Sequence, residues 1–182
     1  MEIKHIFGPD YPRSMDGLFS MQYEPSLMNE YERIMAYWRD RNALYTFFSN
    51  NIDDLENSFW GDVTIEEAII TTKLEAETFH ETLSTYCMDG NYELQYIFQP
   101  LYNSEYRLIS LQKSKGKIRR SWLRLYALRL DRNCFVITGG AIKLTHNMQA
   151  THLQEELTKL ERAKTFLKSR NVYFTEDLNT IR

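Results

Sequence analysis

The spacing of apolar residues predicts an N-terminal part with a strand and several helices. Apolar and polar positions alternate over Gly17–Tyr23, which predicts a half-buried strand, and Ile3–Ile6 is a candidate partner for it. From Leu27 to Trp38 the apolar intervals change to three and four, the spacing of a helix face. Ser26 stands just before this segment, so we expect it to be the N-cap.

Further helices are predicted up to about residue 86. A short helix is expected over about 43–49, followed by an aromatic-rich helical or turn segment that ends at Gly61. Thr64-x-x-Glu67 has the form of a capping box and opens a long helix to about Tyr86. At these spacings, the aromatic side chains are expected to pack in the core against a sheet rather than to stack on a ligand. They are Trp38, Phe47, Phe48, Phe59 and Trp60.

The C-terminal part is predicted to form strands closed by a helix. Tyr106–Lys113 and Trp122–Leu130 are the first two candidate strands, and the cationic connection over 113–120 is typical of a hairpin tip. Cys134–Thr138 is a continuous apolar run that suits a central strand. Thr138-Gly139-Gly140 is expected to be a turn.

Alternation within the second of these strands separates two faces. Leu123, Leu125 and Ala127 share one face, which a helix can bury. Arg124 and Tyr126 point to the other face, two residues apart, and place a cation beside a phenol on one surface of the sheet.

The last predicted element is a helix, which the chain reaches through Lys143 and His146. Thr151-x-x-Gln154 has the form of a second capping box. An apolar stripe continues to Leu167, and cations with Asn171 stand at the expected stop.

The distribution of charge divides the chain in the same place as the hydrophobic pattern. Residues 1–100 hold 6 Lys/Arg and 18 Asp/Glu, a balance of −12, and residues 101–182 hold 16 and 7, a balance of +9. We therefore expect a single compact unit over 1–182 with an acidic half, 1–100, and a basic half, 101–182. Either the basic half has an anionic partner, or the acidic half lies against it.

Composition and motifs narrow the classes of function. The apolar runs are too short to cross a bilayer and the start lacks a signal-peptide pattern, so a cytoplasmic protein without membrane contact is expected. Cys87 and Cys134 are expected to be ordinary buried thiols rather than a disulfide. The chain has no Gly-rich phosphate loop, paired-cysteine motif or nucleophile elbow, so no metal or small-molecule cofactor is predicted.

About residues 105–168 resemble the RelE/ParE-like toxin superfamily, especially its phage HigB-like branch. Members of that branch show a basic strand with an Arg-x-Tyr pattern, an apolar strand, a Lys-Thr exit and a helix. The chain also looks like a bacterial family that joins such a sheet to an acidic helical N-terminal half. The matching residues are Trp122-Leu-Arg-Leu-Tyr-Ala-Leu-Arg129, Phe135-Val-Ile-Thr-Gly-Gly140, Ile142-Lys-Leu-Thr145, and the final helix with Glu156 and Ala163.

The resemblance implies an α+β fold and an activity on RNA. The fold would be an antiparallel sheet of about four strands flanked by helices, with a helical N-terminal extension and a C-terminal helix. The activity would be ribosome-dependent cleavage of mRNA without a metal, and a cognate antitoxin protein would be a second partner. Cleavage needs a positioned ribose 2′-OH, cations on the phosphorane and a proton donor for the leaving oxygen.

Some residue roles are implied by the same resemblance, and others are expected from position and charge. Arg124 and Lys143 match positions that could bind and stabilise the phosphate, and Tyr126 is the matching aromatic residue, for stacking on a base or for proton transfer. His146 follows the exit strand and is the histidine to test first as an acid or base, whereas His80 and His152 are expected to be structural. The candidate RNA-phosphate ligands of the connection are Lys113, Lys115, Lys117, Arg119 and Arg120.

The chain also departs from the family pattern. The exit has a single lysine where members carry a Lys-Lys-Thr sequence, and the chain is net acidic where members are basic. Two other functions therefore stay open. One is a non-enzymatic relative whose acidic half packs over the basic sheet and which acts through protein contacts. The other is a ParE-like inhibitor of a topoisomerase.

Overall fold

A computed structural model describes residues 1–9, 14–56, 59–102, 109–118 and 120–181 of the chain. Their central element is a mixed sheet of six strands in the order β1-β2-β6-β5-β4-β3. Neighbouring strands are antiparallel except β2 and β6, which run parallel. The strands are β1 (Glu2–Phe7), β2 (Gly17–Gln22), β3 (Phe98–Pro100), β4 (Gln112–Gly116), β5 (Leu123–Asp131) and β6 (Cys134–Ile142).

The α+β class is confirmed, but the sheet is larger than predicted and is not purely antiparallel. The acidic half supplies β1, β2 and β3, and β2 joins the strands of the basic half by pairing in parallel with β6, where Gly17 stands opposite Cys134. β3 extends the other edge against β4. The two halves of contrasting charge therefore share one sheet, which local periodicity does not reveal because strand pairing is a long-range property.

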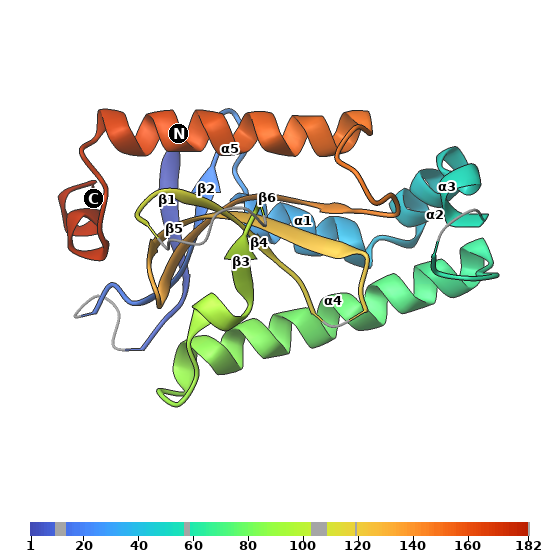
Figure 1. The fold of residues 1–182 in the computed structure, drawn as a ribbon, viewed down its shortest axis with the longest axis horizontal. Coiled ribbons are helices and arrows are strands. Elements are labelled where there is room, and N and C mark those ends of the chain that lie inside the picture. The colour runs from blue at the N-terminus through green and yellow to red at the C-terminus, as the bar shows by residue number, and fades with distance from the viewer. Residues whose placement is uncertain (10–13, 57–58, 103–108, 119, 182) are drawn as a thin grey trace.

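Helices cover both faces of this sheet (Figure 1). α5 runs along one face, and α1 and α4 lie on the other, with α2 and α3 at one end of the molecule. The helices are α1 (Glu30–Arg39), α2 (Arg41–Asn50), α3 (Ile52–Glu56), α4 (Ile65–Met88), η1 (Leu94–Tyr96), α5 (Thr151–Ser169) and η2 (Thr175–Ile181).

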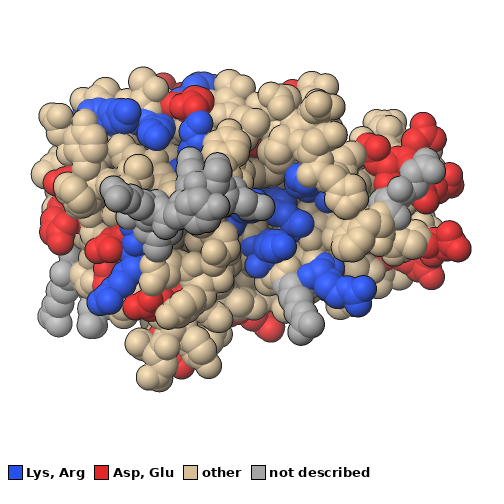
Figure 2. All heavy atoms as spheres, viewed as in Figure 1, with Lys and Arg blue, Asp and Glu red and all other residues tan. Residues whose placement is uncertain are grey.

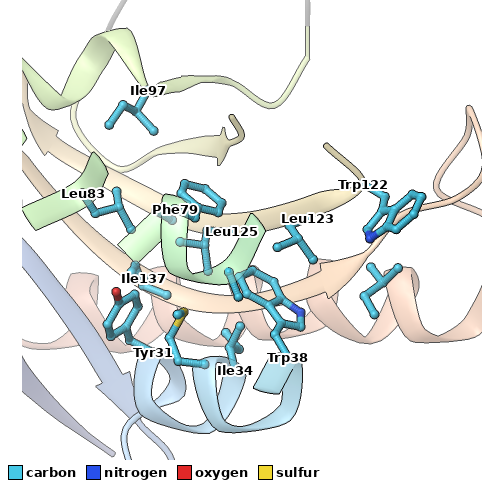
Figure 3. Packing of buried hydrophobic residues seen from close by; sticks show 14 of the residues in the cluster. Tyr31, Ile34, Trp38, Phe79, Leu83, Ile97, Trp122, Leu123, Leu125 and Ile137 are labelled. Atoms are coloured by element: carbon cyan, nitrogen blue, oxygen red, sulfur yellow. The ribbon is translucent and has the colours of Figure 1, made fainter. Parts of the chain in front are cut away.

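The first core lies between the sheet and the helices α1 and α4. Figure 3 shows side chains of both helices meeting the face of β5 that carries Leu123 and Leu125. Trp38 and Phe79 stack there with their ring centroids 6.2 Å apart. The prediction that Leu123, Leu125 and Ala127 face a helix is confirmed.

The second core lies under α5. Tyr126 and Leu128 of β5 and Val136 of β6 pack against α5 residues such as Leu153 and Leu160. Because both faces are covered, β2 is almost entirely buried rather than half-buried. Its Ser20 hydroxyl accepts a hydrogen bond from the Tyr31 amide at 3.0 Å, which satisfies the buried oxygen.

Two helix starts differ from the predictions. α1 begins after Asn29, which forms a full capping box with Glu32, and the predicted cap, Ser26, lies outside the helix. α5 begins at Thr151 with Ala150 at the N-cap position, so Thr151-x-x-Gln154 is not a capping box. The box at Thr64 and the stop near Asn171, whose φ is 56°, are confirmed.

Two strand boundaries also differ. β4 begins at Gln112 rather than at Tyr106, and 106–108 lie outside the described residues. As a result Lys113 and Lys115 belong to a strand and not to a hairpin tip. The predicted turn at Gly139-Gly140 is absent, because β6 continues through both residues to Ile142.

The two cysteines and two of the histidines lie in structural surroundings. Cys87 and Cys134 are both free and buried, as predicted. The Tyr31 hydroxyl lies 2.8 Å from Nδ1 of His80, and Nε2 of His152 lies 2.9 Å from the Ile142 carbonyl oxygen, so both histidines have structural contacts. Within the described part of the chain, every helix is too short or too polar to span a bilayer.

Candidate functional site

A cavity of about 300 Å³ opens beside β4, β5 and the segment that follows β6. It brings together most of the residues that the sequence singles out. The described residues that line it are Leu101, Tyr102, Lys115, Lys117, Arg124, Tyr126, Lys143, His146, Met148 and Leu157. Among these there are four cations and no carboxylate. We call this the cationic cavity.

Strand pairing explains why distant residues meet there. Lys115 of β4 stands directly opposite Tyr126 of β5, and side chains of opposed residues lie on the same face of a sheet. Arg124 is two residues before Tyr126 and pairs with Ala141 of β6. Lys143 lies two residues beyond Ala141, and its amide donates to the Trp122 carbonyl oxygen at 2.8 Å, which continues the same face past the end of β6.

Backbone carbonyl oxygens hold the cationic groups in place. Nη1 of Arg124 donates to the carbonyl oxygens of Ser121 and Leu123 at 2.5 and 2.6 Å. Nζ of Lys143 donates to the carbonyl oxygens of Thr145 and His146 at 2.5 and 2.8 Å. These acceptors orient the side chains but carry no net charge, so they leave the positive potential of the cavity in place.

The pKa values of these groups reflect their crowding. Burial lowers the pKa of Lys143, and the nearby charges of Arg124, Lys115 and Lys117 lower it further. Burial also lowers the pKa of Lys115, with added repulsion from Lys117 and Arg124. Since each positive charge disfavours the charged form of its neighbours, an anion bound among them would relieve the repulsion. The cavity is therefore suited to a phosphate.

Tyr126 forms part of the cavity wall but cannot stack on a base. Its side chain is 1% exposed, because α5 covers the ring. Its hydroxyl lies 3.5 Å from Sδ of Met148, and burial raises the pKa of Tyr126, which keeps the phenol protonated. The prediction that this ring could stack on a base is therefore wrong. Its hydroxyl group can still donate a hydrogen bond.

His146 occupies the rim of the cavity. Its side chain is exposed, and its ring centroid lies 5.9 Å from that of Phe59, which comes from the acidic half. Its imidazole can therefore form a hydrogen bond with a ligand at the edge of the cavity.

The other predicted phosphate ligands do not all reach the cavity. Lys113 lies farther along β4 and forms an ion pair with Glu161 of α5. Arg120 is exposed at a position with φ of 54° and is not among the residues that line the cavity. Arg119 lies outside the described residues.

Several lining residues were not foreseen from the sequence. Leu101, Met148 and Leu157 supply an apolar wall, and Tyr102 supplies a half-exposed ring. No short motif marks them, because they come from three separate segments that only the fold brings together. Phe59 was predicted to be buried but is 67% exposed, which is a correction.

Among the described residues, none from the acidic half lines the cationic cavity. Every described residue that lines it comes from 101–157. The helices α1 and α4 of the acidic half pack on the opposite face of the sheet, against Leu123 and Leu125. Figure 2 shows basic side chains near the middle of the visible face and acidic ones at the end where α2 and α3 lie.

A second charged group lies between α1 and α5 and is internally balanced. Lys159 donates to Oε2 of Glu30 at 3.0 Å and to Oε1 of Glu156 at 2.9 Å, and Arg33 forms two hydrogen bonds with Glu30. Both carboxylates are buried. With two acids and two bases in direct contact, this group has the form of a structural network rather than of a binding site.

The chain was compared with models of protein families, with curated proteins and with solved structures, and none of them matches. The functional assignment therefore depends on the geometry of the cationic cavity. Within the described residues, no three side chains of His, Cys, Asp or Glu come together in a way that could hold a metal ion.

Proposed function

We propose that this protein acts on RNA, and that the cationic cavity binds a phosphodiester and promotes its cleavage without a metal. The observation that supports this most strongly is the cluster of Lys115, Lys117, Arg124 and Lys143 around one small cavity with no carboxylate among its described lining residues. The resemblance to RelE/ParE-like toxins implies a phosphate-binding role for two of these residues, Arg124 and Lys143, and membership of that family is part of the proposal.

The proposed reaction is attack of a ribose 2′-hydroxyl on the adjacent phosphorus. The 2′-oxygen forms a bond to phosphorus, the bond to the 5′-oxygen breaks, and the products are a 2′,3′-cyclic phosphate and a 5′-hydroxyl. One proton leaves the 2′-oxygen and one is delivered to the 5′-oxygen. The charge that develops on the phosphorane is stabilised by fixed cations, and Arg124 suits this role because it stays charged and is held by two backbone carbonyls.

Proton transfer is assigned to Lys143 and His146. The lowered pKa of Lys143 makes its ammonium a better proton donor than an ordinary lysine, which suits protonation of the leaving 5′-oxygen. His146 lies at the exposed rim and can accept the proton of the 2′-hydroxyl. Lys115 and Lys117 add positive charge for binding the phosphate.

The direct test is cleavage of single-stranded RNA in EDTA, with and without translating ribosomes. We expect products that end in a 2′,3′-cyclic phosphate, and a loss of about 100-fold in rate for Arg124→Ala, Lys143→Ala and His146→Ala. Lys73→Ala removes an exposed cation of α4 and is the charge-matched control, with an unchanged rate. Equal rates in all four variants would contradict the assignment.

Expression in a bacterial host separates the catalytic form of the proposal from a non-enzymatic one. A cleaving protein inhibits growth, and Arg124→Ala relieves the inhibition. If the purified protein binds RNA through the cavity but leaves it intact, and growth is unaffected, the non-enzymatic alternative is supported instead. A cognate antitoxin would be expected to carry an acidic segment that neutralises the cavity.

A further inference from the structure

An exposed aromatic side chain stands beside the cationic cavity although it belongs to the acidic half of the chain. Phe59 follows α3 and is 67% exposed, whereas Trp38 and Phe48 from the same half are fully buried. Its ring centroid lies 5.9 Å from that of His146, which lines the cavity. The acidic half thus contributes one large apolar surface to the rim.

The position of Phe59 is fixed by its neighbour. The ring of Trp60 packs edge-on against Trp122 at 5.3 Å, and the Phe59 ring packs against Trp60 at 4.8 Å. Trp122 is in turn held by a hydrogen bond of 2.9 Å from its indole nitrogen to Thr72 of α4. Since the Trp122 carbonyl oxygen also accepts the amide of Lys143, the same residue supports both the aromatic rim and a cation of the cavity.

A second exposed aromatic ring belongs to the cavity lining itself. Tyr102 lines the cavity and is 48% exposed. Cations that bind phosphate, flanked by exposed rings on which bases can stack, are the combination used by proteins that bind single-stranded nucleic acids. Paired bases inside a duplex offer no free face for such stacking.

We propose that Phe59, supported by His146, is a stacking platform for an unpaired base next to the phosphate held in the cationic cavity. This inference rests on the proposed function, because it needs an RNA phosphate in the cavity. It adds that the ligand is single-stranded and that part of its affinity comes from a base rather than from the backbone. Tyr102 is a second surface for a neighbouring base.

The test compares two labelled oligoribonucleotides of equal length, one with bases and one abasic, by fluorescence anisotropy. Phe59→Ala is expected to weaken binding of the base-containing strand by about 10-fold and to leave the abasic strand unchanged. Phe59→Trp, which retains an aromatic face, restores binding. Phe174→Ala is the control, since this phenylalanine is similarly exposed but precedes η2, at the other end of the molecule from α3 (Figure 1).

The outcomes separate this inference from the proposed function. If Lys143→Ala weakens binding of both strands while Phe59→Ala changes neither, the cavity binds phosphate and the stacking platform is wrong. If Phe59→Ala weakens both strands equally, the side chain acts on the shape of the site and not through a base. If Lys143→Ala binds both strands as tightly as the wild type, the cavity itself is not the RNA site and both proposals fail.

Discussion

At the scale of single residues, Gly139 shows how the sheet and α5 are fitted together. A Cβ atom at this position would lie 1.7 Å from Oε2 of Glu156, which is far inside van der Waals contact. The side chain of Glu156 therefore occupies the space that a larger residue would need. The Gly-Gly pair suggested a turn from the sequence, but its physical role is this close approach of a helix side chain to a strand.

Replacement of Gly139 by alanine is expected to destabilise the protein by about 2 kcal/mol, because Glu156 would have to move. Urea unfolding measures this free energy. Gly90→Ala is the control, since a Cβ there meets nothing within 4 Å, and its effect should be near zero. In a Glu156→Ala background the cost of Gly139→Ala should fall, and an unchanged cost would contradict the steric explanation.

Glu156 itself should make stability depend on pH. Burial raises the pKa of this carboxyl above its ordinary value of 4.5, although Lys159 opposes the shift, and its Oε2 has no hydrogen-bond partner among the described residues. The folded state then binds a proton more tightly than the unfolded chain, so the contribution of Glu156 to stability is greatest below pH 4.5 and falls as the pH rises through the raised pKa.

Glu156→Gln removes this titration while keeping the size of the side chain. Relative to the variant, the wild type should lose free energy of unfolding as the pH rises above about 4.5, as measured by urea unfolding at several pH values. Parallel curves for the two proteins would show that the carboxyl does not titrate with a raised pKa in the folded state.

At the scale of elements, the start of α1 depends on the N-cap Asn29 and not on the predicted cap, Ser26. Asn29 accepts the Glu32 amide at 3.1 Å, and the Glu32 carboxylate accepts the Asn29 amide at 3.1 Å. Asn29→Ala should cost about 1 kcal/mol in urea unfolding. Ser26→Ala, at the position first predicted as the cap, should cost clearly less, and equal costs would contradict the observed start of α1.

The contact between α1 and α5 depends on Lys159. Its ammonium is shared by Glu30 and Glu156, two buried carboxylates on different helices. Lys159→Met leaves both acids without this partner and should cost about 3 kcal/mol. Lys168→Met, an exposed lysine near the end of the same helix, is the control and should change stability little. A small effect at Lys159 would show that the network contributes little to helix packing.

At the scale of the whole molecule, the sequence predicted individual helices and strands better than it predicted how they are arranged in space. The long helix after Thr64 and the strands at Gly17 and Leu123 follow from periodicity and capping. The two buried thiols follow from the number of cysteines and the expected reducing compartment. The parallel pairing of β2 with β6 does not follow from either, because nothing local records which strand lies beside which.

The candidate site also combines residues that the sequence predicts with residues that only the fold brings together. Arg124 and Lys143 were predicted from the resemblance and His146 from its place after the exit strand, and all three line one cavity. Tyr102 and Phe59 were not predicted to lie at the cavity, because an exposed aromatic residue has the same local sequence pattern as a buried one. Only the packing of the two halves distinguishes exposed from buried rings. In the described part of the chain, α1 and α4 pack on the face of the sheet opposite the cavity, and the charge pattern alone could not predict on which face they lie.

The most direct test of the central claim is the salt dependence of single-stranded RNA binding. The wild type should lose affinity steeply as salt rises, because cations of the cavity displace counterions from phosphates. Lys117→Ala and Lys143→Ala should each bind more weakly and reduce the slope of log K against log salt by about 0.7, while Lys73→Ala keeps the wild-type slope. Identical affinities and slopes for all four proteins would contradict an RNA site at the cationic cavity.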